Sequence, residues 1–397
     1  MTSPPYYGLR VYKTTDDRVL GLEPTIEEYI ANLVEVFREV WRVLRDDGVC
    51  WINLGDSYAG SPSGSFDSGN RGQGMEGGEF RSNKAFNTAT VSGLSQGNRL
   101  GIPERVALAL QADGWVWRDT IIWAKKSAMP ESLAGWRWER CRVKVKESPC
   151  PLTHGHRPGD NVDEWIGGSM GDGNHQAEWT DCPGCTKCAD NDGLVLRKGS
   201  WRCTSSHEYI FMLTKSMGYY ADGDAVKLAS DANRRSVWND ISPEPYGGSH
   251  FATFPPDLPR LCIQASTSEG GICPKCGSQI TRIIDKPIVG TWHDHTENLT
   301  QGGRQNGAGP AQSYEVGRTV GWRPSCGHTE AIKRPDPALV LDPFMGTGTT
   351  ALAAMRLGRR CVGTELSEDY LGQARKRLSE QSLPLPLVGT PSGHQES

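Results

Sequence analysis

The chain has 397 residues, 37% of them hydrophobic, and a formal net charge of −4 at pH 7. This length allows one large α/β domain with insertions or two domains, and no apolar run approaches the roughly 20 residues of a membrane-spanning helix. No secretory leader opens the chain, so we expect a cytoplasmic protein without a membrane partner, whose 12 cysteines bind metal rather than form disulfides. The small negative charge gives no overall attraction to nucleic acid, so any such contact would come from local basic patches.

The N-terminal third alternates between helix and strand. Residues Thr25 to Leu44 carry apolar side chains at helical spacing behind a capping box, which predicts an amphipathic helix. The β-prone run Val49 to Leu54 follows as a buried strand. Residues 59–100 are rich in Gly, Ser and Asn and have no period, so we expect a long loop that adds nothing to the core.

The middle of the chain contains an interruption. A short helix from Pro103 to Gln111 leads into a strand from Trp115 to Trp123, and the next strand, Glu208 to Thr214, comes only after a long insertion. Residues 296–313 and the tail from 383 to 397 have the composition of flexible segments.

Near the C-terminus the pattern is sharper. It predicts in turn a short apolar strand, a glycine turn, a helix, a second strand and a last helix, which are Ala338–Leu341, Asp342–Gly348, Thr349–Leu357, Cys361–Thr364 and Ser367–Leu378. This order is one unit of a doubly wound α/β sheet.

The glycine turn is a candidate cofactor site. Glycines between strand and helix let a ligand approach the backbone, and Glu365, at the end of the next strand, could bind both hydroxyls of a ribose. The turn lacks the lysine of a phosphate-binding loop and begins with Asp342-Pro343-Phe344, which favours a cationic sulfonium cofactor over a pyrophosphate. A tight connection without ligand is the alternative, and a nicotinamide oxidoreductase would need a glycine where Ala351 stands.

A second motif, Ser3-Pro4-Pro5-Tyr6, opens the chain. Its prolines fix φ and remove two backbone donors, so we expect the local carbonyls to be free to accept hydrogen bonds. An exocyclic amino group of a base is a poor nucleophile, and hydrogen bonds to such a carbonyl and to Ser3 would bias it toward attack while Tyr6 stacks on the extruded base. Taken alone, a Pro-Pro-Tyr tripeptide near a terminus is usually just a turn.

Together the two motifs resemble a family. Thr2–Arg10 followed by Leu341–Gly348 is similar to the β-type amino-group DNA methyltransferases of phages and bacteria, in which the catalytic motif precedes the cofactor motif. The resemblance extends to five further segments, Asn53–Tyr58, Gly101–Pro103, Ile122–Lys125, His207–Phe211 and His250–Pro255. The resemblance implies a Rossmann-like sheet of the S-adenosylmethionine-dependent methyltransferases, in permuted motif order. It also implies an enzyme that methylates cytosine N4, or adenine N6 as a close second, on a flipped base of double-stranded DNA. A cognate restriction nuclease is a partner that this family can have.

The resemblance also implies roles for single residues. The catalytic residues would be Ser3, Pro4, Pro5 and Tyr6. The S-adenosylmethionine site would comprise Asp342, Pro343, Phe344, Gly346, Gly348, Glu365, Phe251, Phe254 and Pro255. Family members have a strand before the catalytic motif, whereas Met1 stands directly against it here, so we expect that strand to be missing. A catalytically impaired DNA- or RNA-binding relative is therefore the alternative function.

Two groups of cysteines have the spacing of structural Zn²⁺ ligands. The first is Cys182, Cys185 and Cys188 with Cys141 as the fourth ligand, for which Cys150 and Cys203 are alternatives; the second is Cys273, Cys276, Cys326 and His328. In the first insertion Arg142, Lys144 and Lys146 alternate, which suggests a phosphate-contacting strand face or a solvated edge.

We accordingly expect six regions. They are the catalytic half of the methyltransferase domain at 1–126, a zinc-binding insertion at 127–206, a return to the core with the cofactor-pocket segment at 207–262, a second zinc-binding insertion at 263–335, the cofactor-binding half at 336–382 and a flexible tail at 383–397. Target recognition would lie broadly in residues 127–248.

Overall fold

The structure is a computed structural model that describes residues 1–8, 19–60, 93–126, 134–146, 178–241, 254–285 and 317–381. The chain forms two compact units, residues 1–126 with 207–397 and residues 127–206. No helix among the described residues is both long and apolar enough to cross a bilayer.

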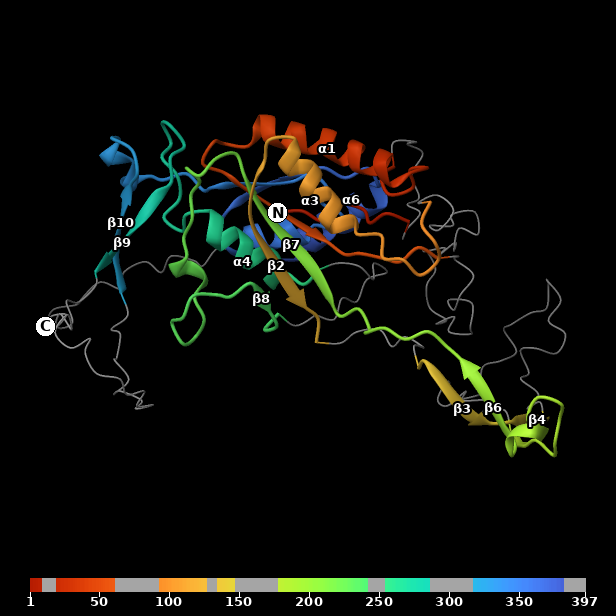
Figure 1. The fold of residues 1–397 in the computed structure, drawn as a ribbon. Coiled ribbons are helices and arrows are strands. Elements are labelled where there is room, and N and C mark those ends of the chain that lie inside the picture. The colour runs from red at the N-terminus through yellow and green to blue at the C-terminus, as the bar shows by residue number, and fades with distance from the viewer. Residues whose placement is uncertain are drawn as a thin grey trace, which may run out of the picture. The chain divides into compact units, whose positions relative to one another are not determined.

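The larger unit is built on a mixed sheet (Figure 1). Four strands lie in the order β1 (Val49–Leu54), β7 (His207–Thr214), β2 (Val116–Ala124) and β8 (Val237–Trp238). Strand β7 is antiparallel to both β1 and β2, and β2 is parallel to β8. The C-terminal ends of β1 and β2 therefore meet the N-terminal end of β7 at one edge.

A second, parallel pair of strands consists of β11 (Leu339–Asp342) and β12 (Arg360–Gly363). The first two residues of the chain connect this pair to β1. Thr2 pairs in parallel with β1 through two backbone hydrogen bonds, Thr2 N to Trp51 O at 3.0 Å and Asn53 N to Thr2 O at 2.9 Å. The Met1 ammonium donates to the Leu341 carbonyl of β11 at 3.3 Å.

The strand expected before the catalytic motif is present only as a single bridge. Thr2 pairs in parallel with Ile52 of β1, the Met1 ammonium donates to Leu341 of β11, and the motif follows directly. Two residues are too few to show a strand pattern in the sequence, so only the pairing reveals them.

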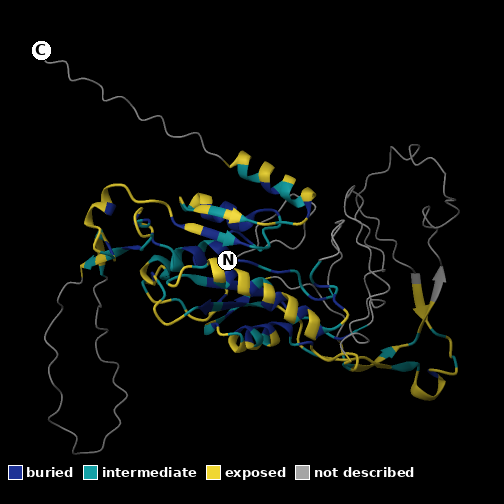
Figure 2. Cartoon of the chain, turned by 90° about the horizontal axis from the view of Figure 1, so that it is seen from above, coloured by how far each residue is buried: buried dark blue, intermediate teal, exposed yellow. Residues whose placement is uncertain are grey.

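Helices cover both faces of this sheet. They are α1 (Ile26–Val43), α3 (Ile102–Ala112), α4 (Asp257–Ser266), α5 (Thr349–Arg356) and α6 (Glu368–Glu380). The β1 side chains divide between the two faces, because successive residues of a strand point in opposite directions. Ile52 and Leu54 pack with Phe37 of α1, whereas Trp51 packs with Leu258 of α4. In Figure 2 the interior of the larger unit is mostly dark blue and teal, and the outward helix faces are yellow.

The predicted helix boundaries agree with the structure within a few residues. Thr25 caps α1 by accepting from the Glu28 amide, and Ser367 caps α6 by accepting from the Tyr370 amide. The prediction for the 59–100 loop is wrong at its two ends, because Ala59 and Leu100 are both 1% exposed and belong to the core. Residues 61–92 lie outside the described part.

A ribbon and two 3-10 helices also belong to the larger unit. Strands β9 (Ile280–Asp285) and β10 (Arg318–Pro324) form an antiparallel ribbon, followed by a 3-10 helix at Thr329–Lys333. A further 3-10 helix lies at Asp224–Val226.

The described residues of the smaller unit form two antiparallel ribbons and a 3-10 helix at Ala189–Asn191. The ribbons are β3 (Trp136–Arg140) with β6 (Leu194–Lys198) and β4 (Arg142–Lys146) with β5 (Glu178–Asp181). The predicted basic strand is thus present as β4. Its register shifts between Lys144 and Lys146, and the side chains from Lys144 onward are not described, so their shared face stays a prediction.

Candidate active site

Tyr6 lies where the strands β1, β2 and β7 meet. Its hydroxyl donates to Glu208 Oε2 at 2.8 Å and lies 3.3 Å from Asn53 Oδ1. The other oxygen of the Glu208 carboxylate pairs with Lys125 Nζ. The sheet register causes this convergence, since Leu54 pairs with Tyr209 and Trp123 with Glu208.

The surroundings keep the Tyr6 phenol neutral. Burial is the largest cause that raises the pKa of Tyr6 well above its usual value, the negative charge of Glu208 is the next, and a hydrogen bond with Ser3 opposes them. A protonated hydroxyl can donate to the carboxylate, so the ring is fixed at both its hydroxyl and its backbone.

The backbone beside the ring leaves room for glycine alone. A Cβ added at Gly55 would lie 2.8 Å from Tyr6 Cε2 and 3.4 Å from Glu208 Cγ. Contacts below 3.0 Å do not occur for real Cβ atoms, so Gly55 permits the ring to pack against the end of β1. Asn53 Nδ2 donates to the Tyr209 carbonyl at 3.2 Å, which directs its oxygen toward Tyr6.

The carbonyls of the motif differ in their partners. Tyr29 donates its hydroxyl proton to the Pro5 carbonyl at 2.7 Å, so the expectation of free carbonyls is wrong for Pro5. Among the described residues, no donor contacts the Pro4 carbonyl. Pro4 is buried and Ser3 is half-buried. No described residue donates to the carbonyls of Ser3 and Tyr6 either, so the carbonyl of Pro4 is one of three motif carbonyls that remain as acceptors for a ligand.

A buried carboxylate connects the motif to the glycine turn. Asp342 is 1% exposed, and its Oδ1 accepts from Thr2 Oγ1 at 2.6 Å and from the Phe344 amide at 3.0 Å. Thr350 Oγ1 of α5 also lies 3.4 Å from the Met1 carbonyl. Two motifs that are 340 residues apart in the sequence are therefore neighbours in the fold.

Glu365 supports the glycine turn from the end of β12. Its Oε2 accepts from the Gly346 amide at 2.8 Å and its Oε1 from the Ser367 amide at 2.9 Å. A carboxylate has about four acceptor positions, so two remain for ligand hydroxyls. Thr347 in the same turn has a buried hydroxyl with no partner among the described residues.

The two glycines of the turn do different things. Both have positive φ, 53° at Gly346 and 80° at Gly348, a conformation that favours glycine. A Cβ at Gly346 would meet nothing within 4 Å, whereas one at Gly348 would lie 3.1 Å from Ala374 Cβ of α6. The open side of the turn is at Gly346, and Gly348 allows helix packing.

The remaining predicted cofactor residues are less closely placed. Pro343 and Phe344 are half-buried, and Phe344 packs on the core that contains Tyr7. Phe254 packs on the core cluster that contains Met1, and Pro255 is buried two residues before the start of α4. Phe251 lies outside the described residues.

Four cysteines of the smaller unit converge. The Sγ atoms of Cys141, Cys182, Cys185 and Cys188 all lie within 4.8 Å of one another. Cys185 Sγ is 3.8 Å from that of Cys141 and 3.6 Å from that of Cys188. Tetrahedral Zn²⁺ with Zn–S bonds of ~2.3 Å requires about 3.8 Å between sulfurs. Hydrogen bonding, first from the Lys187 backbone, lowers the pKa of Cys185 to about 7.

A second cluster lies beside the β9–β10 ribbon. It comprises the Sγ atoms of Cys273, Cys276 and Cys326 with one nitrogen of His328, all within 4.8 Å. His328 Nδ1 is 3.6 Å from the sulfurs of Cys273 and Cys326. Hydrogen bonds from Ser278 are the largest cause that lowers the pKa of Cys276 to about 6. Both donor sets are chemically suited to Zn²⁺. Of the alternatives for the first site, Cys203 is exposed and outside the cluster, and Cys150 is not described.

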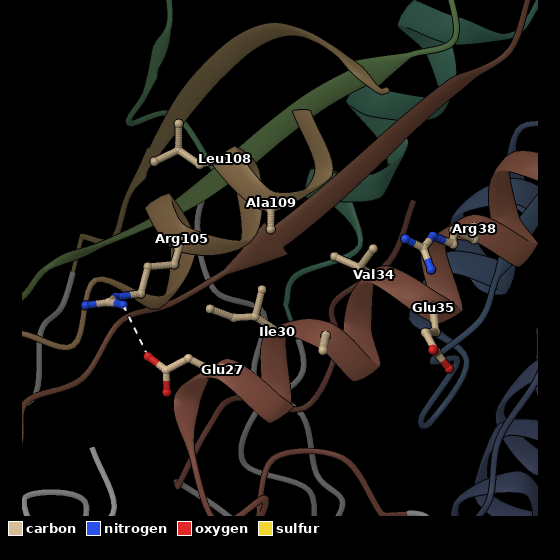
Figure 3. A pocket seen from close by; sticks show the side chains of 9 residues that line it. Glu27, Ile30, Val34, Glu35, Arg38, Arg105, Leu108 and Ala109 are labelled. Atoms are coloured by element: carbon tan, nitrogen blue, oxygen red, sulfur yellow. Dashed lines mark ion pairs between the residues drawn. The ribbon is translucent and has the colours of Figure 1, made fainter. Parts of the chain in front are cut away.

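A shallow hollow lies between α1 and α3 (Figure 3). Apolar side chains that include Ile30, Val34 and Leu108 line it, and Glu27 and Arg105 form an ion pair at 3.9 Å across one end. It contains no residue of the catalytic motif or of the glycine turn, so it adds no chemical group to the site.

Sequence reasoning missed Asn53, Gly55, Lys125 and Glu208 as site residues. All four stand in segments that carry the family resemblance, which was the available signal. The sequence could not predict that these four residues converge in one site, because their convergence depends on the placement of β7 between β1 and β2.

A Pro-Pro-Tyr motif beside a glycine turn, on a mixed sheet covered by helices, defines an enzyme of the amino-methyltransferase class. The comparison with known families agrees. The model of the DNA methylase family, which covers N6 and N4 methyltransferases, matches residues 1–284 and 334–376, and the chain belongs to this family.

Named relatives span nearly the whole chain. The Type II methyltransferase M.SmaI of Serratia marcescens is 30% identical over 386 residues, which cover 95% of this chain and 82% of the relative. The Type II methyltransferase M.Cfr9I of Citrobacter freundii is 30% identical over 390 residues, 95% of this chain and 80% of the relative. The solved structure of the cytosine-N4-specific PvuII DNA methyltransferase aligns with 97% of this chain and 80% of its own at 15% identity and a TM-score of 0.44, a likeness too distant to assign the target base.

Proposed function

We propose that the protein transfers a methyl group from S-adenosylmethionine to the exocyclic N4 of a cytosine within a specific sequence of double-stranded DNA. Adenine N6 is the second candidate. The observation that carries the proposal is the junction of Thr2 and Asp342, which holds the Pro-Pro-Tyr motif against the glycine turn. The relatives named Type II methyltransferases support site-specific modification, and a cognate restriction nuclease is the partner this implies.

The glycine turn suits the cofactor. Open space and positive φ at Gly346 allow close approach, and the free acceptor positions of Glu365 suit ribose hydroxyls. When bound, S-adenosylmethionine supplies an electrophilic methyl group on a sulfonium. Phe344 would lie beside it, with Phe251, Phe254 and Pro255 completing the pocket in the permuted motif order.

The catalytic motif would orient the amino group of a base that has been flipped out of the duplex. The Pro4 carbonyl and the Ser3 hydroxyl accept its two hydrogens, which directs the nitrogen lone pair out of the ring plane. Tyr6 stacks on the base, and the hydrogen bond from Tyr6 to Glu208 fixes the ring. Most of the rate then comes from alignment rather than from a covalent intermediate.

Zn²⁺ at both clusters would be structural, since each set supplies four protein ligands and leaves no open position. In the smaller unit, Cys141 N donates to Gly193 O and Cys182 N donates to Cys141 O, so a metal at this cluster would fasten the two ribbons together. Small polar segments of this kind gain folding free energy from metal binding.

The pairing of Thr2 with β1 favours an active enzyme over the alternative, a catalytically impaired DNA- or RNA-binding relative. Transfer of labelled methyl groups to mixed-sequence duplex DNA tests the proposal. We expect Tyr6→Ala to abolish transfer and Tyr6→Phe to retain part of it, while both bind the cofactor as the unmodified protein does. Full activity of Tyr6→Ala would refute the assigned role.

A further inference from the structure

The smaller unit exposes tryptophans in an unusual way. Among the described residues, the tryptophans that are exposed are Trp136, Trp138, Trp179 and Trp201, and all four lie in this unit. Their exposed fractions run from 51% to 71%. A large exposed indole leaves apolar area in water, so a cluster of them marks a surface that contacts a partner.

The β3–β6 ribbon separates its side chains into two faces. Residues directly opposite in an antiparallel ribbon share a face, and Trp136 pairs with Lys198, Trp138 with Leu196. Lys198 Nζ stands 4.8 Å from the centre of the Trp136 ring. Arg140, two residues beyond Trp138, completes the same row. We call this the tryptophan face.

The opposite face is different in kind. There Glu139 pairs with Arg137 and lies 3.4 Å from Arg197. Its one carboxylate, Glu139, is shared by two arginines, whereas the two strands place no acidic residue beside Arg140 and Lys198 on the tryptophan face. A surface that combines aromatic rings with positively charged side chains, and has no acidic partner for them, is suited to bind a polyanion that also has flat or apolar surfaces.

We infer that the tryptophan face binds the DNA duplex, with Arg140 and Lys198 on phosphates and the two indoles against the sugars and base edges of a groove. A two-stranded ribbon fits the major groove, which is ~12 Å wide in B-DNA. This inference rests on the proposed function, because it names the surface through which that substrate is held.

The matched test uses two neighbouring residues of β6. Lys198→Gln removes a positive charge from the tryptophan face, and Arg197→Gln removes one from the opposite face. Each phosphate contact that is lost reduces the slope of the logarithm of the DNA-binding constant against the logarithm of the salt concentration by about 0.9. We expect that decrease in slope for Lys198→Gln and an unchanged slope for Arg197→Gln. Equal effects of the two variants would overturn the assignment of the face.

A second variant, Trp136→Ala with Trp138→Ala, tests the rings. We expect duplex affinity to fall about tenfold or more, with cofactor affinity and bound zinc unchanged. Unchanged duplex affinity in a protein that still binds cofactor would overturn the inference. So would equal competition by duplex RNA, whose deep and narrow major groove excludes such a ribbon. A methylation assay of the unmodified protein separates this inference from the proposed function. If the unmodified protein methylates DNA and these variants bind the duplex as tightly as it does, the inference about the tryptophan face fails and the proposed function stands.

Discussion

The packing of Gly55 against Tyr6 gives a quantitative prediction. In Gly55→Ala the new Cβ would stand 2.8 Å from Tyr6 Cε2, and ordinary contact begins at 3.4 Å, so the ring must move by roughly 0.6 Å. The ring cannot turn away freely, because its hydroxyl is held by Glu208. Misplacement of a reacting group by ~1 Å can cost about 10²-fold in rate, so we expect kcat to fall by about 10- to 100-fold.

The neighbouring Gly60 provides the control. A Cβ at Gly60 would meet only the Tyr58 carbonyl, at 3.9 Å, so Gly60→Ala should keep its activity. The assay is single-turnover methyl transfer with cofactor affinity measured in parallel. We expect Gly55→Ala to retain cofactor affinity, because the glycine turn does not contact Gly55. Equal kcat values for the two variants would refute the view that the position of the Tyr6 ring limits the reaction.

Three further predictions follow from single contacts. Glu208→Gln removes the negative charge that raises the pKa of Tyr6, so an ultraviolet pH titration should find a tyrosine that ionises at lower pH than in the unmodified protein; an unmoved titration would contradict the contact. Thr2→Val removes a buried hydrogen bond to the Asp342 carboxylate and should lower the free energy of unfolding by about 1.5–3 kcal/mol. The control Thr319→Val, at an exposed hydrogen bond, should change it little, and equal values for the two variants in denaturant titrations would argue against the junction. Cys185→Ser should reduce the zinc content in native mass spectrometry from two ions to one and make residues 127–206 sensitive to protease, and Cys203→Ser should do neither; two ions in both variants would exclude the first site.

Local signals predicted part of the regular structure: helices α1, α3, α5 and α6 and strands β1, β2, β7, β11 and β12, but not helix α4 or strands β3, β6, β9 and β10. The capped helix α1 and the apolar strand β1 show their period and their ends within a single segment, so no distant residue is needed to recognise them. The β11 to α6 unit was readable for the same reason. Its glycine turn and its acidic residue Glu365 are spaced by the geometry of the unit itself.

Contacts between distant segments were not readable. Tyr29 reaches the Pro5 carbonyl from a helix whose own pattern only marks Tyr29 as buried. The pair of Glu208 and Lys125 depends on where β7 inserts in the sheet. The pairing of Thr2 with β1 and the contact of Met1 with β11 could not be predicted, because two residues are too few to show a strand pattern.

The two motifs meet at Thr2 and Asp342, and we propose that this junction positions a methyl group for transfer to an exocyclic amino group in DNA. Nucleoside mass spectrometry of duplex DNA, after incubation with the protein and S-adenosylmethionine, would identify the product. N4-methylcytosine is the product we predict, and N6-methyladenine would keep the chemistry while changing the base. 5-Methylcytosine, or DNA without any new methylated nucleoside, would contradict the account.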